Sequence, residues 1–473
     1  MNSHEQYTAL FTDHRALIEN GSCAALNAQR QAAFDTLCRV GLATKREERY
    51  KYTSANEAFA PDFGLNLKRI APTVNPYEAY KCNVPNLSTS LFFVVNDVPC
   101  EAPECSRALL PEGVIVDSFT KVAQTHPELL ERFYNRAACT ERDFKQGADG
   151  VTQLNTMLAQ DGLLVYLPDG VELKSPVQLV NVSAARMDFM SVRRVLIVAG
   201  KGARGAVLFC DHAEGSNNYL TTQVVEVFAD EDAQLDLYSI EETTPQNTRF
   251  STIYVEQQSR SRVSYDGVTL TNGLTRNRMD VRLRGTDAAS ELYGAVIADG
   301  KQQVDNNILV EHLAPRCTSD MLYKYVLNGE SRGAFAGKVY VAPGAQQTAS
   351  QQTNANLCAS TGARAFSQPM LEIYADDVKC NHGSTIGKLD EQALFYMRQR
   401  GIPEAEARLL LQHAFINEVL RHVQIPLLHE RLAHLVDLRF RGSSTPRPNC
   451  SCITAYNDTT SGRFRCSTAC PFS

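Results

Sequence analysis

Polar turns recur at a nearly constant interval through the middle of the chain, and this spacing limits the folds it can adopt. The turns GKGARG, DEDAQL, QSRSRV and GTDAAS begin at residues 200, 230, 258 and 285, so successive starts differ by 30, 28 and 27 residues. Short alternating apolar runs follow the turns, and no convincing helix of ten residues interrupts the region from 163 to about 386. This pattern predicts a β-solenoid whose coils stack their apolar faces, with a β-sandwich as the alternative.

Helical spacing appears on both sides of this β region. Before it, apolar residues recur at three and four positions in Ala24–Val40 and again around 128–144 and 152–160. After it, a short helix is expected over 390–400, where Gly401 ends it, followed by helices over 404–422 and 426–438. Residues from about 60 to 115 are rich in Pro and Asn and are expected to be irregular.

These patterns together predict a mainly β protein with helical ends. The expected domains are an N-terminal helical domain (1–160), a β-helix core (161–388) and a C-terminal helical domain (389–440). Residues 441–473 contain mostly Ser, Thr, Pro, Asn and Arg without apolar periodicity, which predicts a disordered tail. Its four cysteines, Cys450, Cys452, Cys466 and Cys470, could bind a metal, but their spacings differ from the usual zinc pairs.

Composition excludes several classes of function. The net charge of −6 with mixed signs gives no sign of nucleic-acid binding. No apolar stretch approaches 18 residues and the N-terminus lacks a basic leader, so a cytoplasmic protein without membrane insertion is expected. In such a reducing compartment most of the 14 cysteines should be thiols. The G-x-G-x-x-G at residues 200–205 precedes another β run instead of a helix, so it does not predict dinucleotide binding.

Cys380 and His382 are the strongest candidates for chemistry. They lie two residues apart at the end of an extended run, and residues i and i+2 of a strand point to the same face. A thiol beside an imidazole suits iron or zinc, or a thiolate that a base keeps ionised. Two packed side chains are the plainer alternative, and a thiol or metal-dependent enzyme that uses the pair as nucleophile and base is another. Cys358, 22 residues earlier, is expected to be a packing residue.

The region from 315 to 401 strongly resembles the SufD family of iron–sulfur cluster assembly proteins. Weaker matches extend the resemblance to most of residues 30 to 440. The motifs that carry it are CTSDMLYK (317–324), SRG (331–333), GKVYV (337–341), AQQT (345–348), EIYADDVKCNHGSTIG (372–387) and LDEQALFYMRQRGI (389–402).

The resemblance implies a non-catalytic scaffold subunit with a right-handed parallel β-helix. Its core would join a SufB-like paralogue, and its C-terminal domain would dock a SufC-like ABC ATPase that hydrolyses ATP. Cys380 and His382 match the family's functional pair, so they are expected to hold iron or a nascent cluster together with partner ligands. No stably bound cofactor is expected, and the chain alone could form a homodimer.

The expected ATPase-docking surface comes from the two helices after Gly387. Phe395, Leu410, Leu411 and Phe415 supply more large apolar surface than two short helices can bury between themselves. Part of this set is therefore expected to contact the partner.

Overall fold

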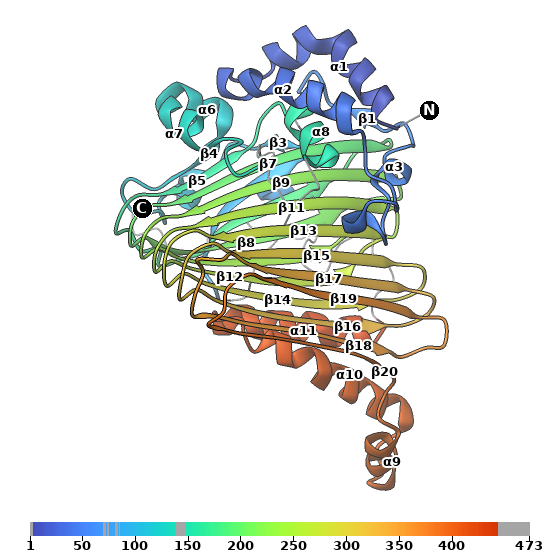
Figure 1. Cartoon of the computed structure of the whole chain (residues 1–473). Coiled ribbons are helices and arrows are strands. Elements are labelled where there is room, and N and C mark those ends of the chain that lie inside the picture. The colour runs from blue at the N-terminus through green and yellow to red at the C-terminus, as the bar shows by residue number, and fades with distance from the viewer. Residues whose placement is uncertain are drawn as a thin grey trace, which may run out of the picture.

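The computed structural model describes residues 3–69, 72, 75–80, 84, 86–138 and 148–442. It shows a parallel β-helix whose coils stack side by side, with one group of helices over its N-terminal coils and a second group along its C-terminal part (Figure 1). The predicted fold class is therefore confirmed. The predicted tail lies outside the described residues apart from Arg441 and Gly442.

The strands alternate between two sheets, and this alternation distinguishes a β-helix from a sandwich. One sheet has the order β19-β17-β15-β13-β11-β9-β7-β5-β4, and the other has the order β20-β18-β16-β14-β12-β10-β8-β6-β2-β3. Along the coils, each strand pairs in parallel with the strand two places further along the chain. The bounds of the first sheet are β4 Ile115–Ser118, β5 Leu163–Leu167, β7 Phe189–Ala199, β9 Tyr219–Ala229, β11 Asn247–Gln257, β13 Leu274–Leu283, β15 Gln303–His312, β17 Arg332–Val341 and β19 Arg364–Ile373, with β1 Gly64–Leu65 beside β7.

The second sheet begins earlier in the chain than the turn spacing suggested. Its strands are β2 Ser90–Val95, β3 Val98–Pro99, β6 Val177–Ser183, β8 Arg204–Ala213, β10 Gln234–Glu242, β12 Arg262–Thr271, β14 Ala289–Ala298, β16 Thr318–Leu327, β18 Thr348–Cys358 and β20 Val378–Gly387. Strand β2 lies in the stretch that was expected to be irregular, yet it pairs in parallel with β6. At this end β3 and β4 run antiparallel to their neighbours and finish the two sheets.

Most helices lie where the spacing of apolar residues predicted them. The N-terminal ones are α1 Ser3–Asn20, α2 Ala24–Val40, α3 Ala55–Ala58, α4 Pro76–Ala79, α5 Glu104–Arg107, α6 Phe119–Thr125, α7 Pro127–Phe133 and α8 Gly150–Leu158, with a 3₁₀ turn at Glu48–Tyr50. The C-terminal ones are α9 Glu391–Gln399, α10 Glu404–Leu420 and α11 Pro426–Phe440. Helices α1, α3, α4, α5 and α6 were not predicted, and the helix expected around 128–144 ends at Phe133. None of the helices in the described part of the chain is long and apolar enough to cross a membrane.

The predicted polar turns form a stack in which each turn repeats one backbone conformation. Gly202, Asp232, Arg260, Asp287 and Arg316 occupy equivalent places and have φ values of 64°, 61°, 59°, 61° and 59°. Their backbone N–H groups each donate to a carbonyl in the next turn. The left-handed conformation costs energy for residues other than Gly. The cross-turn hydrogen bonds offset this cost and hold neighbouring coils at one spacing.

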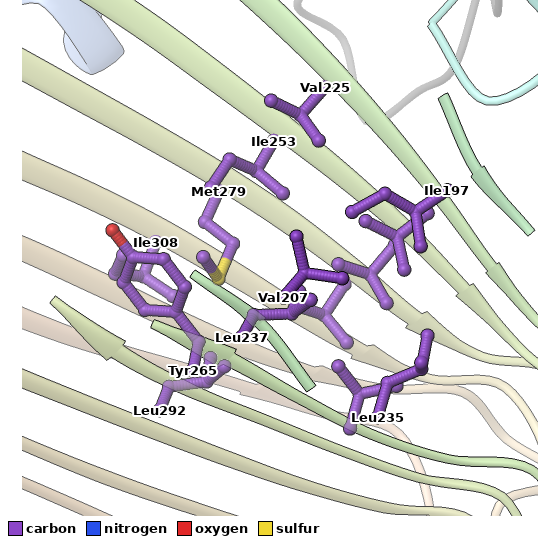
Figure 2. Packing of buried hydrophobic residues seen from close by; sticks show 14 of the residues in the cluster. Ile197, Val207, Val225, Leu235, Leu237, Ile253, Tyr265, Met279, Leu292 and Ile308 are labelled. Carbon is purple, nitrogen blue, oxygen red and sulfur yellow. The ribbon is translucent and has the colours of Figure 1, made fainter. Parts of the chain in front are cut away.

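The interior of the β-helix is filled by alternate side chains of both sheets. Figure 2 shows these side chains converging from the two sheets. The first sheet supplies Ile197, Val225, Ile253, Met279 and Ile308, and the second supplies Val207, Leu235, Leu237, Tyr265 and Leu292. Residues of opposite parity face outward, where the terminal helices cover part of them. Because side chains alternate between the two faces of a strand, every second residue of each strand lines the interior. This interior is the lumen of the β-helix.

One outward-facing carboxylate fastens the N-terminal region to the solenoid. Glu226 on β9 is fully buried and accepts hydrogen bonds from the backbone N–H groups of Asn135, Ala137 and Ala138 at 2.8, 2.9 and 3.1 Å. It also pairs with the fully buried Arg194 of β7 at 2.8 Å. Each Glu226 oxygen thus binds the segment after α7.

We expect Glu226→Ala to lower the free energy of unfolding by about 3–5 kcal/mol, because it leaves Arg194 buried without its countercharge. The measurement is a thermal or denaturant unfolding curve of the purified chain. Glu231→Ala is the matched control, since Glu231 forms exposed ion pairs whose loss should cost only about 0–1 kcal/mol. Equal curves for the two variants would show that Glu226 is not a principal attachment.

Candidate functional site: the open end of the solenoid

The C-terminal end of the β-helix is open, unlike the other end. Within the described part of the chain, β19 pairs only with β17 and β20 only with β18, so both strands have a free edge. Several large apolar side chains near these strands are exposed: Tyr374 is 60% exposed and Ile386 is 55% exposed. Free strand edges with apolar neighbours are a template for pairing with another chain.

Cys380 and His382 both lie on β20, in this last coil, and the strand's parity places both on the lumen side. Val378 and Cys380 pack against the apolar interior cluster. Further along, the hydroxyl of Ser384 donates across the lumen to the hydroxyl of Ser367 on β19 at 2.7 Å. His382 lies between two inward-facing neighbours of the same parity, so it shares their face. The predicted placement of the pair on one face agrees with this arrangement.

The two side chains differ in exposure because the lumen opens at this coil. Cys380 is half-buried, whereas the His382 side chain is exposed and its imidazole makes no hydrogen bond with another described residue. Burial raises the pKa of the Cys380 thiol, and a hydrogen bond from the Ser350 backbone offsets part of that shift.

The described residues do not contain a group of three or more Cys, His, Asp or Glu side chains that could hold a metal ion. The pair therefore offers one sulfur and one nitrogen ligand, fewer than the four of a closed zinc site. Any iron or cluster at this end needs further ligands from elsewhere. The open end places the pair where a second chain could supply them.

The next coil inward lies directly beneath the pair. Ser350 of β18 is in register with Cys380, and Gln352 of β18 is in register with His382. Both are buried, at 3% and 0% exposure. Sequence analysis missed these two residues, because turns of unequal length hide which residue of one coil lies under which residue of the next.

Cys358 also lies at the lumen side, at the end of β18, and packs against the same interior cluster. Burial raises the pKa of its thiol, the shift being opposed by nearby Arg364. Cys358 is in register with Leu327 on the neighbouring strand β16. Its position supports the predicted packing role. The cysteines of the tail lie outside the described residues.

The predicted docking set divides into exposed and half-buried members. Phe395 on α9 and Leu410 on α10 are 61% and 42% exposed, and Tyr396 beside them is 57% exposed. Leu411 and Phe415 instead pack against the cluster between the C-terminal helices and the second sheet, where Lys324 lies 4.4 Å above the Phe415 ring. They face the sheet because α10 lies along it. These two are thus mainly packing residues.

The fold and the open end define a class: a β-helical scaffold with a Cys-His pair at an unpaired edge. Family models give the particular family. "SufBD protein N-terminal region" matches residues 1–179, and "SUF system FeS cluster assembly, SufBD core domain" matches residues 181–415. The chain belongs to the SufBD family of iron–sulfur cluster assembly proteins.

Curated relatives agree with this assignment. An iron–sulfur cluster assembly SufBD family protein of Synechocystis is 28% identical over 438 residues, covering 90% of this chain and 93% of the relative. Iron–sulfur cluster assembly protein SufD of Escherichia coli is 24% identical over 422 residues, covering 88% and 93%. A SufBD family protein of Mycobacterium leprae is 32% identical over 240 residues, covering 49% and 60%.

Proposed function

We propose that this chain is a SufD-like scaffold subunit of a SufBCD-type complex. The observation that carries the proposal is the open solenoid end, where the last coil presents Cys380 and His382 beside two free strand edges. A SufB-like paralogue with a similar solenoid would continue both sheets across this edge. Iron or a nascent cluster, as cargo, would then lie between the two chains.

The chemistry of the pair fits this cargo. Thiolates are the usual ligands of iron–sulfur clusters and imidazole also binds iron. Because Cys380 and His382 supply only two ligands, the paralogue would complete the coordination. The cargo would form at the interface and would not remain as a resident cofactor.

The C-terminal helices would carry the ATPase. Helix α9 extends away from the solenoid in Figure 1, and it holds Phe395 and Tyr396 in exposed positions. A SufC-like ABC ATPase would dock there and hydrolyse ATP, so this subunit would be non-catalytic. A cytoplasmic location belongs to the same proposal.

A variant of the free edges tests the pairing. We expect Ile373→Lys combined with Ile386→Lys to reduce retention of the SufB-like paralogue at least about tenfold, because lysines at an edge oppose strand addition. The ATPase should still co-purify, since its expected surface lies on α9 and α10. Pull-down from the native cell, followed by mass spectrometry, measures both partners.

Leu109→Lys is the control, because Leu109 is similarly exposed, at 37%, but lies far from this end in the sequence. The isolated parent chain is expected to pair with itself through the same edges, and the double variant should sediment as a monomer. Undiminished paralogue binding by the double variant would contradict the proposed interface.

A further inference from the structure

Gln352 lies at the floor of the candidate site, and only one end of its side-chain amide is hydrogen-bonded. Its side chain is fully buried, and its Nε2 donates to the backbone carbonyl of Gly337 on β17 at 3.0 Å. Its Oε1 has no hydrogen-bond partner in the described structure. A buried polar atom without a partner costs about 1–3 kcal/mol.

The orientation of this amide is fixed by its surroundings. The Gly337 carbonyl can only accept, so the Gln352 nitrogen must face it and the oxygen must face elsewhere. Gly337 also makes room for the amide, because a Cβ there would lie 2.2 Å from Gln352 Nε2. Gln352 therefore cannot satisfy its oxygen by exchanging the two ends of the amide.

His382 is the neighbour in register with Gln352, on the same lumen face of the next strand. Adjacent strands lie about 4.8 Å apart, which is within reach of a glutamine and a histidine side chain. Deeper in the same row the residues are Met321 and Leu292, both apolar and buried. Gln352 is thus the first polar side chain beneath His382 in this row, and the two coils below it are apolar here.

We infer that Gln352 is a positioning residue for His382, and this inference rests on the proposed function. Its Oε1 accepts a hydrogen bond from one ring N–H of His382 when the imidazole turns over the lumen. A neutral imidazole has one donor nitrogen and one acceptor nitrogen, so this bond fixes the tautomer and leaves the other nitrogen free to bind iron. This one contact gives a hydrogen-bond partner both to Gln352 Oε1 and to a ring N–H of His382.

The ¹⁵N chemical shifts of the two ring nitrogens measure the tautomer of His382 directly. The full chain is labelled with ¹⁵N-histidine, and its spectrum is recorded at pH 8, where a neutral ring is the main form of an ordinary histidine. His382→Gln assigns the His382 signals among the ten histidines. We expect the two ring nitrogens to resonate far apart in the parent chain and to move toward each other in Gln352→Leu, as the tautomers mix.

Asn356→Leu is the matched control. Asn356 is another buried amide on β18 with an unpartnered oxygen, and its Nδ2 donates to the Thr385 carbonyl of β20 at 3.0 Å. Its loss should leave the His382 nitrogens unchanged. Unchanged His382 signals in Gln352→Leu would overturn the inference.

A second readout separates this inference from the proposed function. Iron retained by the co-expressed complex should fall about tenfold in Gln352→Leu, in line with other residues that orient a metal-binding histidine. If His382→Ala lowers iron but Gln352→Leu changes neither iron nor tautomer, the function stands and the positioning role fails. If Gln352→Leu mixes the tautomers but His382→Ala retains full iron, Gln352 orients the imidazole but the proposed role of His382 as an iron ligand fails.

Discussion

The full chain carrying Phe395→Asp and Leu410→Asp is expected to lose its ATPase partner while it keeps the SufB-like paralogue. These two side chains are exposed, at 61% on α9, which extends away from the solenoid, and at 42% on α10, which lies along the second sheet. Central apolar residues of an interface typically contribute about 2 kcal/mol or more, which is roughly a 30-fold loss of affinity for each substitution. Affinity purification of the chain and quantification of the co-purified ATPase provide the measurement.

Point variants are preferable to truncation after Gly387. Ile416, Leu428 and Leu432 of α10 and α11 are buried against the second sheet, and truncation would expose that apolar face. Met187→Asp is the control, because Met187 is 67% exposed but lies in the loop between β6 and β7. Retained ATPase in the double variant would move the docking surface away from α9 and α10.

His382→Ala should remove most of the iron–sulfur absorbance of the co-expressed complex. The imidazole is exposed at the open end, so its loss should change the stability of the chain by no more than about 0.5 kcal/mol. Cys380→Ser should also lower cluster content, since it removes the sulfur ligand. His382→Cys should restore part of the content, because a thiolate is another ligand suited to iron.

Two controls separate ligand loss from general damage. Asn381→Ala changes the residue between the pair, which has the opposite parity and is exposed. Cys358→Ser changes a thiol at the lumen side of the previous coil. Both variants, and loss of the four tail cysteines, should leave cluster content near that of the parent. Full absorbance in His382→Ala would reduce the pair to a packing feature.

Local patterns predicted the elements of this fold well. The helix over Ala24–Val40 has the bounds that its apolar spacing indicated, and the β region expected from 163 begins with β5 at Leu163. The turn interval was informative because each coil must return the chain to the same place in the stack. Strand β2 was missed although Leu91–Val95 is a continuous apolar run typical of a buried strand, because the Pro and Asn residues around it indicated an irregular stretch.

The site was predictable only in part, because the register between coils cannot be read from local sequence. The two-residue spacing of Cys380 and His382 places them on one face whatever the strand pairs with. Gln352 could be found only from the register between coils, which the unequal turns conceal. Similarly, helical spacing identified Leu411 and Phe415 as apolar but could not show that they face the sheet.

The difference between the two ends of the solenoid also affects how a cell handles unassembled copies. At the last coil, β19 and β20 leave backbone donors and acceptors without a strand partner among the residues that the structure describes. A subunit made in excess would display these edges to chaperones, proteases and other copies of itself, whereas an assembled subunit would hide them. Exposure of these edges would thus distinguish unassembled from assembled copies. Balanced synthesis of the subunits would protect the chain from aggregation and turnover.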